Sequence, residues 1–239
     1  MEIPSSHPRK KSLEQREKIL EGMEKGITAK AGLIAQGRGE AFDYLIGEKT
    51  TKPAEKAIQA AVTKLKEAKH PVLSVNGNIA ALVPEEYSEL GKMLGAPLEI
   101  NLFYRTPERM RKIRKAMEAA GCTNLLSGED AVIQVESERR KVDSRGQAVA
   151  DVILVPLEDG DRTETLKKQG KFVITIDLNP LSRTARKADI SIVDNVTRAV
   201  PLMIKYAKNP KKVDFDNDEN LRQMLEIIGE RMKDERILD

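Results

Sequence analysis

Three runs of β-branched and other apolar residues in the second half of the chain each end at a cluster of polar residues. The runs cover residues 151–156, 172–176 and 189–193, and the polar clusters follow at 157–163, 177–184 and 194–195. Near-continuous Val and Ile runs bounded by turn residues are typical of strands buried on both faces, which indicates a parallel sheet covered by helices. Ligands bind such sheets outside the carboxyl ends of the strands. We therefore expect the three clusters to converge on one binding site.

The upstream part of the chain continues the alternation of strands and helices. It predicts strands at 71–75 and 98–103, whereas residues 12–68 look wholly helical. We expect Ser12 to cap the first helix, and Gly37 and Gly39 to punctuate the second. The pattern predicts an α/β fold: a Rossmann-like, mostly parallel sheet flanked by helices, with a helical N-terminal region.

The 239 residues are enough to bury a substantial core. We predict one compact unit with a helical N-terminal region at 1–70, a Rossmann-like core at 71–210 and a C-terminal helix within 211–239. Residues 123–150 form a polar, irregular loop insertion in the core. A long loop inside a compact domain is more often functional or interfacial than idle.

Charge and composition exclude several classes of protein. The 41 basic and 38 acidic side chains leave a net charge of only +3, and aromatic residues make up 3% with no Trp, so neither a basic field nor a base-stacking platform indicates nucleic acid. The single cysteine, Cys122, excludes a disulfide within the chain and a CxxC motif. The opening residues do not have the pattern of a signal peptide, and no apolar run is long enough for a membrane span. We expect a cytoplasmic protein that binds neither nucleic acid nor membrane.

Several well-known catalytic and nucleotide-binding motifs are absent from the sequence. No GxGxxG follows a strand, and no GxxxxGK[ST] is present, so a dinucleotide dehydrogenase or a P-loop enzyme is not indicated. HExxH and GxSxG are also missing. The basic segment 109–115 has apolar interruptions, and we interpret it as a solvated helix face.

The polar clusters at the predicted strand ends carry the candidate chemistry. Glu158, Asp159 and Asp161 follow a buried strand, and three carboxylates within four residues suit Mg²⁺, although a solvated turn would look the same. In the next cluster, Asp177 can accept hydrogen bonds from ribose hydroxyls, and the planar fork of Arg183 can hold a phosphate. The 76–78 Asn-Gly-Asn segment favours a plain strand-to-helix turn and an anion site about equally.

With these residues, the chain resembles the archaeal phosphopantothenate synthetases, which are 4-phosphopantoate:β-alanine ligases of coenzyme A biosynthesis. The matching segments lie at 3–9, 37–45, 47–50, 75–78, 80–82, 136–139, 141–143, 158–164, 176–185 and 193–195. They extend from the N-terminus almost to residue 200, so the resemblance covers nearly the whole chain. The small departures are Ile79 in place of Thr, Lys10 in place of Tyr and Arg140 in place of a small residue.

The resemblance implies that 4-phosphopantoate and β-alanine are condensed while ATP is cleaved to AMP and diphosphate, through an acyl-adenylate. It implies ATP contacts at Arg16, Arg38, Asp177, Leu178, Asn179, Arg183, Thr184, Asn195 and Val196. Because the reaction must offset repulsion between a carboxylate and a triphosphate, we expect a cation cluster and Mg²⁺. We assign catalytic roles to Arg38, Asn76 and Asp159, and substrate binding to Asn76 and Asn78. The resemblance also implies a homodimer, with the C-terminal helix and the 123–150 loop as candidate interface segments.

Two other classes of protein stay open. A non-catalytic sensor of nucleotides or sugar phosphates would use the same strand ends, but would have less need for the carboxylates at 158–161. An RNA-binding protein could use the basic helices around 109–115 and 198–212, and its affinity would fall steeply with salt.

Overall fold

A six-stranded sheet forms the centre of the computed structural model, which describes residues 4, 6, 7 and 9–234. In the sheet order β3-β2-β1-β6-β7-β8, all neighbouring strands are parallel. The strands are β1 (Pro71–Val75), β2 (Leu98–Ile100), β3 (Leu125–Leu126), β6 (Val152–Leu154), β7 (Phe172–Ile176) and β8 (Ile190–Ile192). The predicted Rossmann-like α/β class is therefore confirmed.

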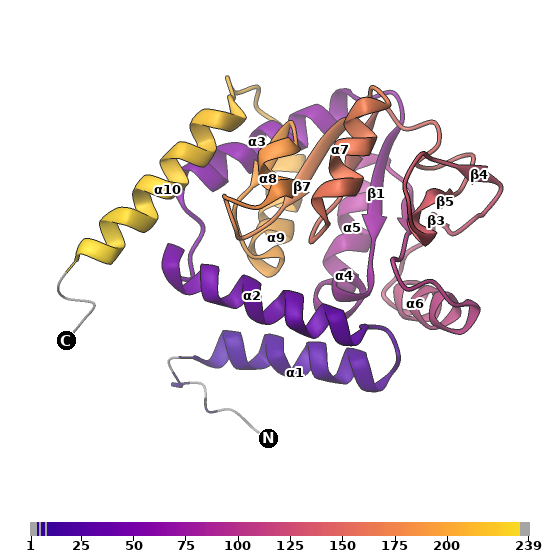
Figure 1. The fold of residues 1–239 in the computed structure, drawn as a ribbon, viewed down its shortest axis with the longest axis horizontal. Helices are drawn as coiled ribbons and strands as arrows, with labels where there is room; N and C mark the ends of the chain where they lie inside the picture. Colours follow the sequence, from indigo (N-terminus) through magenta and orange to yellow (C-terminus); the bar gives the residue numbers. More distant parts are fainter. Residues whose placement is uncertain (1–3, 5, 8, 235–239) are drawn as a thin grey trace.

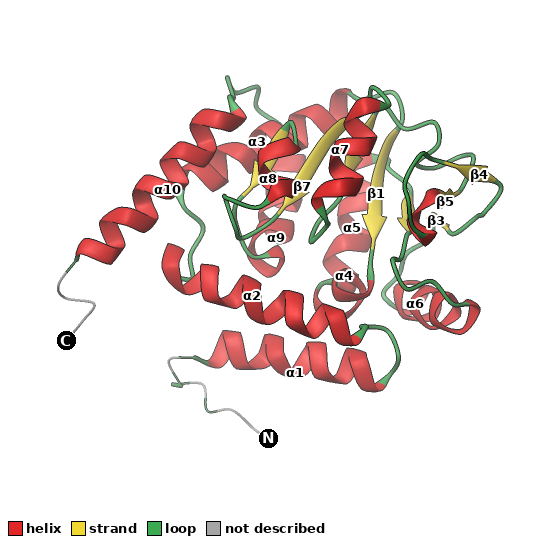
Figure 2. Cartoon of the chain, viewed as in Figure 1, coloured by secondary structure: helices red, strands yellow, loops and turns green. Residues whose placement is uncertain are grey.

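Helices cover both faces of the sheet, as the buried strands require. In Figure 1, α7 (Gly160–Lys168) and α8 (Arg183–Lys187) lie in front of the sheet, and α3 (Lys52–Glu67), α5 (Pro84–Leu94) and α9 (Val196–Ala207) lie behind it. Figure 2 shows the strands as a yellow layer between these two layers of red helices. The apolar core extends from Ile19 near the N-terminus to Ala207 in α9, so the N-terminal helices belong to the same packed unit as the sheet.

The remaining helices lie beyond the carboxyl ends of the strands and along the two sides of the sheet. α1 (Lys10–Glu24) packs against α2 (Lys30–Ile46) and against α4 (Gly77–Leu82), and α2 lies beyond the end toward which the β1 arrow points in Figure 1. α6 (Pro107–Ala119) covers β2 and β3, and α10 (Asn217–Lys233) packs along α2, α3 and α8. No helix in the described part of the chain is long and apolar enough to cross a membrane.

The structure corrects two local predictions in the N-terminal region. The first helix begins at Lys10, and Ser12 lies inside it, where its hydroxyl donates to the carbonyl oxygen of Arg9 at 3.1 Å. Gly37 and Gly39 lie within α2 and do not interrupt it. Glycine lowers helix stability but does not end a helix that tertiary contacts hold.

The segment 123–150 is less irregular than its composition indicates. It supplies β3, a short antiparallel pair of β4 (Ala131–Val132) with β5 (Lys141–Val142), and the 3₁₀ turn η1 (Glu138–Arg140). β2 ends at Ile100, three residues earlier than predicted, and the side chain of the next residue, Asn101, donates to the carbonyl oxygen of Arg139 at 3.0 Å. Strands of two residues are too short to show a periodicity in the sequence.

Glu99 in β2 fastens this segment to the sheet. Its side chain is fully buried, and its two carboxylate oxygens accept from the backbone N–H groups of Asp143, at 3.0 Å, and Gln147, at 2.6 Å. Burial raises the pKa of Glu99 to about 7, although these two hydrogen bonds favour the charged form. The folded protein therefore holds a proton here at pH values where the unfolded chain has released it.

We predict that Glu99 makes the protein less stable as the pH rises from about 5 to about 8. A group whose pKa is raised in the folded state stabilises the protein at low pH, and this stabilisation is lost as the pH rises through the folded-state pKa. For Glu99 the shift corresponds to a loss of at most about 3 kcal/mol in the free energy of unfolding. Unfolding free energies of the parent and Glu99→Gln, measured by urea titration across this range, isolate the effect. The difference between the two proteins should change with pH, and a constant difference would contradict the prediction.

Candidate active site

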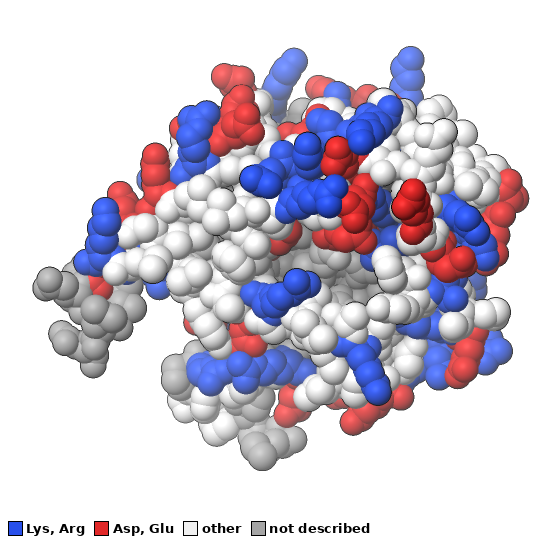
Figure 3. Space-filling view, in the orientation of Figure 1, with Lys and Arg blue, Asp and Glu red and all other residues white. Residues whose placement is uncertain are grey.

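A cavity of about 670 Å³ lies at the carboxyl ends of the strands, between the sheet and α2. Small residues on one side of α2, among them Gly32, Ala35 and Gly39, line it and leave room for a ligand. All predicted site residues except Arg16 and Asp161 line this cavity, namely Arg38, Asn76, Asn78, Glu158, Asp159, Asp177, Leu178, Asn179, Arg183, Thr184, Asn195 and Val196. In Figure 3 a hollow is visible below α7 and α8, and acidic and basic side chains crowd together above it.

The floor of the cavity is the place where the strand order reverses. β1 and β6 are neighbours, and the chain leaves them toward opposite edges of the sheet, which is the usual ligand crevice of such folds. Asn76, directly after β1, donates from Nδ2 to the carbonyl oxygen of Pro156 at 2.9 Å, which lies just beyond β6. Its Oδ1 accepts from the backbone N–H groups of Asn78 and Ile79 and thereby caps α4. One side chain thus joins the two halves of the sheet at the crevice.

Two longer helices begin at the cavity, since Asp159 and Gly160 at the start of α7 and Asn195 and Val196 at the start of α9 line it. α7 is capped by Asp159, which accepts from the N–H of Arg162 at 3.0 Å, and α9 is capped by Asn195, which accepts from the N–H of Thr197 at 3.1 Å. The positive end of a helix dipole favours an anion at this position. The geometry therefore suits a phosphorylated ligand.

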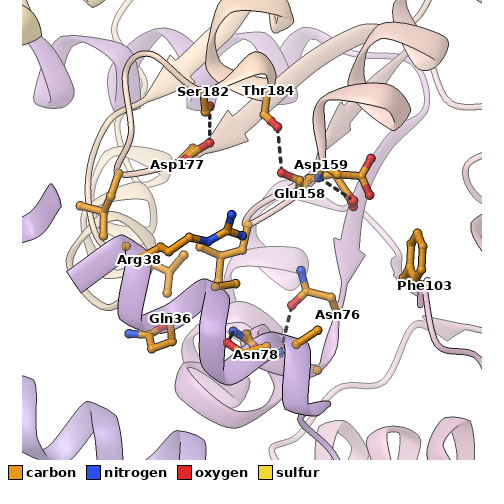
Figure 4. Close-up of a pocket in the computed structure, with 18 of the residues that line it drawn as sticks. Gln36, Arg38, Asn76, Asn78, Phe103, Glu158, Asp159, Asp177, Ser182 and Thr184 are labelled. Atoms are coloured by element: carbon orange, nitrogen blue, oxygen red, sulfur yellow. Dashed lines mark hydrogen bonds between the residues drawn. The ribbon is translucent and has the colours of Figure 1, made fainter. Parts of the chain in front are cut away.

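The loop after β7 is shaped by Asp177. Its carboxylate accepts from the N–H of Asn179 at 3.0 Å and from the hydroxyl of Ser182 at 2.5 Å. Burial raises the pKa of Asp177, although these hydrogen bonds and the nearby charge of Arg38 oppose the shift. The hydroxyl of Thr184 donates to the carbonyl oxygen of Glu158 at 2.8 Å, which ties this loop to the loop after β6. The contacts of Ser182 with Asp177 and of Thr184 with Glu158 are drawn in Figure 4.

Arg38 extends from α2 into the cavity between Asp177 and Glu158, as Figure 4 shows. Its neighbours Arg183 and Arg139 are engaged: Arg183 pairs with Asp161 at 2.6 Å, and Arg139 with Asp159 at 3.0 Å. Among the described residues, Arg38 makes no ion pair within 4.0 Å, so its charge is available to a ligand.

Asn195 is held by a buried network that joins α2 to α9. Its Nδ2 donates to Asp43 at 3.0 Å and to Gln15 at 2.9 Å. Arg198 bridges the carboxylates of Asp43 and Asp194, with its Nη2 at 2.5 Å and 2.6 Å from one oxygen of each, and burial raises the pKa of Asp194 despite this cation. This network positions the end of β8 against the helical N-terminal region.

The opposite end of the cavity was not predicted from the sequence. It is lined by Phe103 and Tyr104, whose rings meet edge to face at 5.0 Å between centroids, and by Arg109 and Arg139. Arg109 donates from Nε to the carbonyl oxygen of Ile27 at 3.0 Å, and burial lowers its pKa, which contradicts the interpretation of 109–115 as a purely solvated helix face. The two aromatic residues follow β2, so the rule that ligands bind at strand ends could have indicated them.

The three carboxylates proposed for Mg²⁺ do not form one cluster. Glu158 is buried between Arg139 and Arg162, Asp159 pairs with Arg139, and Asp161 is 76% exposed and pairs with Arg183. Within the described residues no group of three or more His, Cys, Asp or Glu side chains is arranged to hold a metal ion. The sequence showed three acids in a row, but their partners come from segments far away in the chain.

Arg16 lies outside the cavity. Its guanidinium forms a two-point pair with Glu40, with Nη2 at 2.7 Å from Oε1 and Nε at 2.9 Å from Oε2, and these hydrogen bonds raise the pKa of Arg16. It lines a separate hollow of about 490 Å³ between α1 and α2. The structure therefore does not bring Arg16 together with the other predicted residues.

Fold and site together define a class: α/β proteins with a cavity at the switch point of a parallel sheet whose lining suits a phosphorylated ligand. Within this class, the chain belongs to the phosphopantothenate/pantothenate synthetase family, whose sequence model matches residues 53–232. The resemblance found in the sequence is thereby confirmed.

The chain is also similar to individual curated proteins of this kind. The 4-phosphopantoate–β-alanine ligase of Thermococcus kodakarensis is 59% identical over 95% of this chain and 86% of its own length. The enzyme of the same name from Thermococcus onnurineus is 55% identical over 97% and 94%, and that from Methanosarcina mazei is 49% identical over 97% and 96%.

We predict that Asn76→Ala lowers the stability by about 1 to 2 kcal/mol, because it removes both the cap of α4 and the bridge to Pro156. Asp216→Ala is the matched control, since Asp216 caps the exposed start of α10 and makes no bridge between strands. Thermal and urea unfolding of the two variants measure the difference. Equal losses would mean that the bridge adds nothing to the cap.

Proposed function

We propose that the protein is an ATP-dependent ligase that condenses 4-phosphopantoate with β-alanine. The products would be 4'-phosphopantothenate, AMP and diphosphate, and the reaction would serve coenzyme A biosynthesis. Membership of the synthetase family supports the assignment, as do relatives named 4-phosphopantoate–β-alanine ligase that match nearly the whole chain. The structural observation that carries it is a single cavity with two different ends, one suited to a nucleotide and one lined by two further arginines.

ATP would occupy the end formed by the loops after β7 and β8. Asp177 and the Asn179 loop would contact the ribose, and the N-terminus of α9 at Asn195 and Val196 would contribute backbone N–H groups. Arg38 and Arg183 would supply charge to the triphosphate, and Thr184 would contribute from the start of α8. Arg183 would exchange Asp161 for phosphate oxygens.

Arg16 stays a candidate ATP contact on the strength of the family resemblance alone. To reach a phosphate it would have to leave the carboxylate of Glu40.

The acidic substrate would occupy the other end, where Arg109 and Arg139 reach the cavity wall. Arg139 pairs with Asp159 and would exchange this carboxylate for the phosphate group of the substrate. Asn76 and Asn78 lie between the two ends and would orient the pantoate hydroxyl or β-alanine. In this arrangement the substrate carboxylate faces the α-phosphorus of ATP.

The chemistry would proceed in two steps that need no protein nucleophile. The carboxylate attacks the α-phosphorus, forms an acyl–phosphate bond and releases diphosphate; the amine of β-alanine then attacks the acyl carbon, and AMP leaves. Arg38 would stabilise the charge that develops during the first step, and the proton that the β-alanine ammonium must lose would pass to solvent. Alignment of the reacting groups supplies much of the remaining acceleration.

Mg²⁺ would supply further charge compensation for the triphosphate when bound. It prefers one or two carboxylates together with water and substrate phosphates, so a cluster of three protein carboxylates is not required. Asp159 fits this role best, because Glu158 is enclosed by two arginines and Asp161 faces solvent.

We also propose a homodimer. Large apolar side chains are exposed on the two segments suggested as interface pieces, with Val132 at 71% and Val149 at 51% in the insertion and Met232 at 69% on α10. The two segments lie on opposite sides of the structure in Figure 1, so each is a separate candidate for contact with a second copy.

We predict that the purified protein forms AMP and diphosphate only when ATP, Mg²⁺, 4-phosphopantoate and β-alanine are all present. Unphosphorylated pantoate should be a poor substrate, because Arg109 and Arg139 would lose charge-assisted hydrogen bonds to its phosphate. Product formation followed by chromatography for each omission tests this. Equal turnover of pantoate and 4-phosphopantoate would contradict the proposed substrate.

We predict that Arg38→Lys weakens ATP binding and slows AMP formation, and that Arg38→Ala costs about 2 to 4 kcal/mol of transition-state stabilisation. Lys keeps the charge but loses the planar fork of the guanidinium. Arg186→Lys on α8 is the control, since Arg186 is exposed and lies outside the cavity lining. Parental kcat/KM for ATP in Arg38→Lys would rule out a forked contact, and parental values in Arg38→Ala would remove Arg38 from the site.

A further inference from the structure

Arg162 has the largest of the fully buried side chains in the described part of the protein, at 0% exposed. It lies in the first turn of α7 and points toward the sheet, where Nη1 donates to Glu158 and Nη2 donates to Gln147 and, at 3.4 Å, to Ser74. Burial lowers its pKa to about 10, so it is still charged at neutral pH. A buried ion pair is weak evidence for stability, because apolar residues of the same volume often serve as well. Stability alone therefore does not explain why a charged side chain is buried at position 162.

Glu158 connects Arg162 to the cavity. Its side chain is almost fully buried, and its two carboxylate oxygens face different arginines, Oε2 toward Arg162 and Oε1 toward Arg139. Oε1 also accepts from the N–H of Asp159 at 3.0 Å. One carboxylate thus separates two like charges, of which Arg162 lies beneath the cavity and Arg139 lines it.

Arg139 is held at the cavity wall by contacts on several sides. Nη1 lies 3.0 Å from Oδ2 of Asp159, and the guanidinium carbon lies 5.9 Å from the ring centroid of Phe103. Burial first, and then the charge of Arg162, lower its pKa to about 10. Because Arg162 occupies the second oxygen of Glu158, Arg139 can pair with that carboxylate through one oxygen only.

We propose that Arg162 is a positioning residue: it holds Glu158 from beneath and thereby keeps Arg139 and Asp159 at the end of the cavity that takes the acidic substrate. The inference deepens the proposed ligase function and rests on it. Without the fork of Arg162, both oxygens of Glu158 become available to Arg139. Its guanidinium would then turn from the cavity wall toward the buried carboxylate.

The nucleotide end should be affected much less. Direct hydrogen bonds of the Arg162 side chain go to Glu158, Gln147 and Ser74, all on the β1 and β6 side of the cavity or in the insertion. Among the described residues, the Asp177 loop reaches Glu158 through the hydroxyl of Thr184, which bonds the backbone of Glu158 and not its carboxylate. It reaches α7 through Arg183, whose ion pairs go to Asp161 and Glu164 and not to the partners of Arg162. A loss of Arg162 should therefore separate the two substrates kinetically.

The decisive variant is Arg162→Lys, made in the full chain. Lysine keeps the buried positive charge, but a single ammonium cannot replace a planar fork that bonds Glu158 and Gln147 from two nitrogens. With one substrate varied and the others saturating, we expect the KM for 4-phosphopantoate to rise about tenfold and the KM for ATP to change by less than about twofold.

Two further proteins test the path of the effect. Lys168→Arg on the same helix, at a side chain that is 73% exposed and pairs with Glu164, should keep both KM values. Arg139→Lys should reproduce the selective rise, and the double variant with Arg162→Lys should be no worse than Arg139→Lys alone. Two residues that act through one contact are not additive.

A purely structural role predicts a different result. It would lower the melting temperature of Arg162→Lys and leave the ratio of the two KM values at the parental level, which would overturn the proposal. If Arg162→Lys does not fold, Glu158→Gln decides, since it removes the carboxylate that connects the two arginines; an unchanged ratio there overturns the proposal as well. If the parent protein forms AMP and the variants show no selective rise in the KM for 4-phosphopantoate, only the role of Arg162 is contradicted. If the parent protein has no activity, the ligase function and this inference are both contradicted.

Discussion

The parallel pairing of β1 with β6 is the constraint on which the rest of the structure depends. Parallel strands place all their carboxyl ends at one edge of the sheet, and the reversal of strand order at this pair opens a crevice there. Asn76 closes the pair with a bond to Pro156 and starts a helix with the same side chain. Loops far apart in the sequence therefore meet at one cavity, and α2 covers it from outside.

Charge at this cavity is organised by pairing rather than by excess. Arg139, Arg183 and Arg198 each face carboxylates, so the protein avoids the cost of several unpaired cations in a partly buried space. Arg38 and Arg109 line the cavity without an ion-pair partner among the described residues; Arg109 donates to the carbonyl oxygens of Ile27 and Tyr104, whereas Arg38 lies between Asp177 and Glu158. A polyanionic ligand would meet these two guanidinium groups, the N-termini of α7 and α9, and arginines that can exchange a carboxylate for a phosphate.

The helical segments outside the sheet support the site directly. Asp43 of α2 bonds both Asn195 and Arg198, which fixes the wall of the cavity to the end of β8. On the other side of the loop after β7, Leu178 packs against α10 in a small apolar cluster with Met224 and Ile228. The N-terminal and C-terminal helices thus support the end of the cavity formed by the loops after β7 and β8, while the insertion, fastened by Glu99, supplies Arg139 to the other end.

The sequence by itself determined the fold class and indicated most residues of one end of the cavity, because β-branched runs followed by polar residues report strand ends, and strand ends of one parallel sheet must lie together. Residues after β1, β6, β7 and β8 were found in this way. Only the tertiary structure decided which charges remain available: Arg16 pairs with Glu40, and Glu158 is enclosed by Arg139 and Arg162. It also decided that Arg109, on a helix that looked solvated, turns inward to Ile27. Periodicity describes local structure, whereas the partner of a charged side chain depends on which distant segment packs beside it, and no local pattern contains that information.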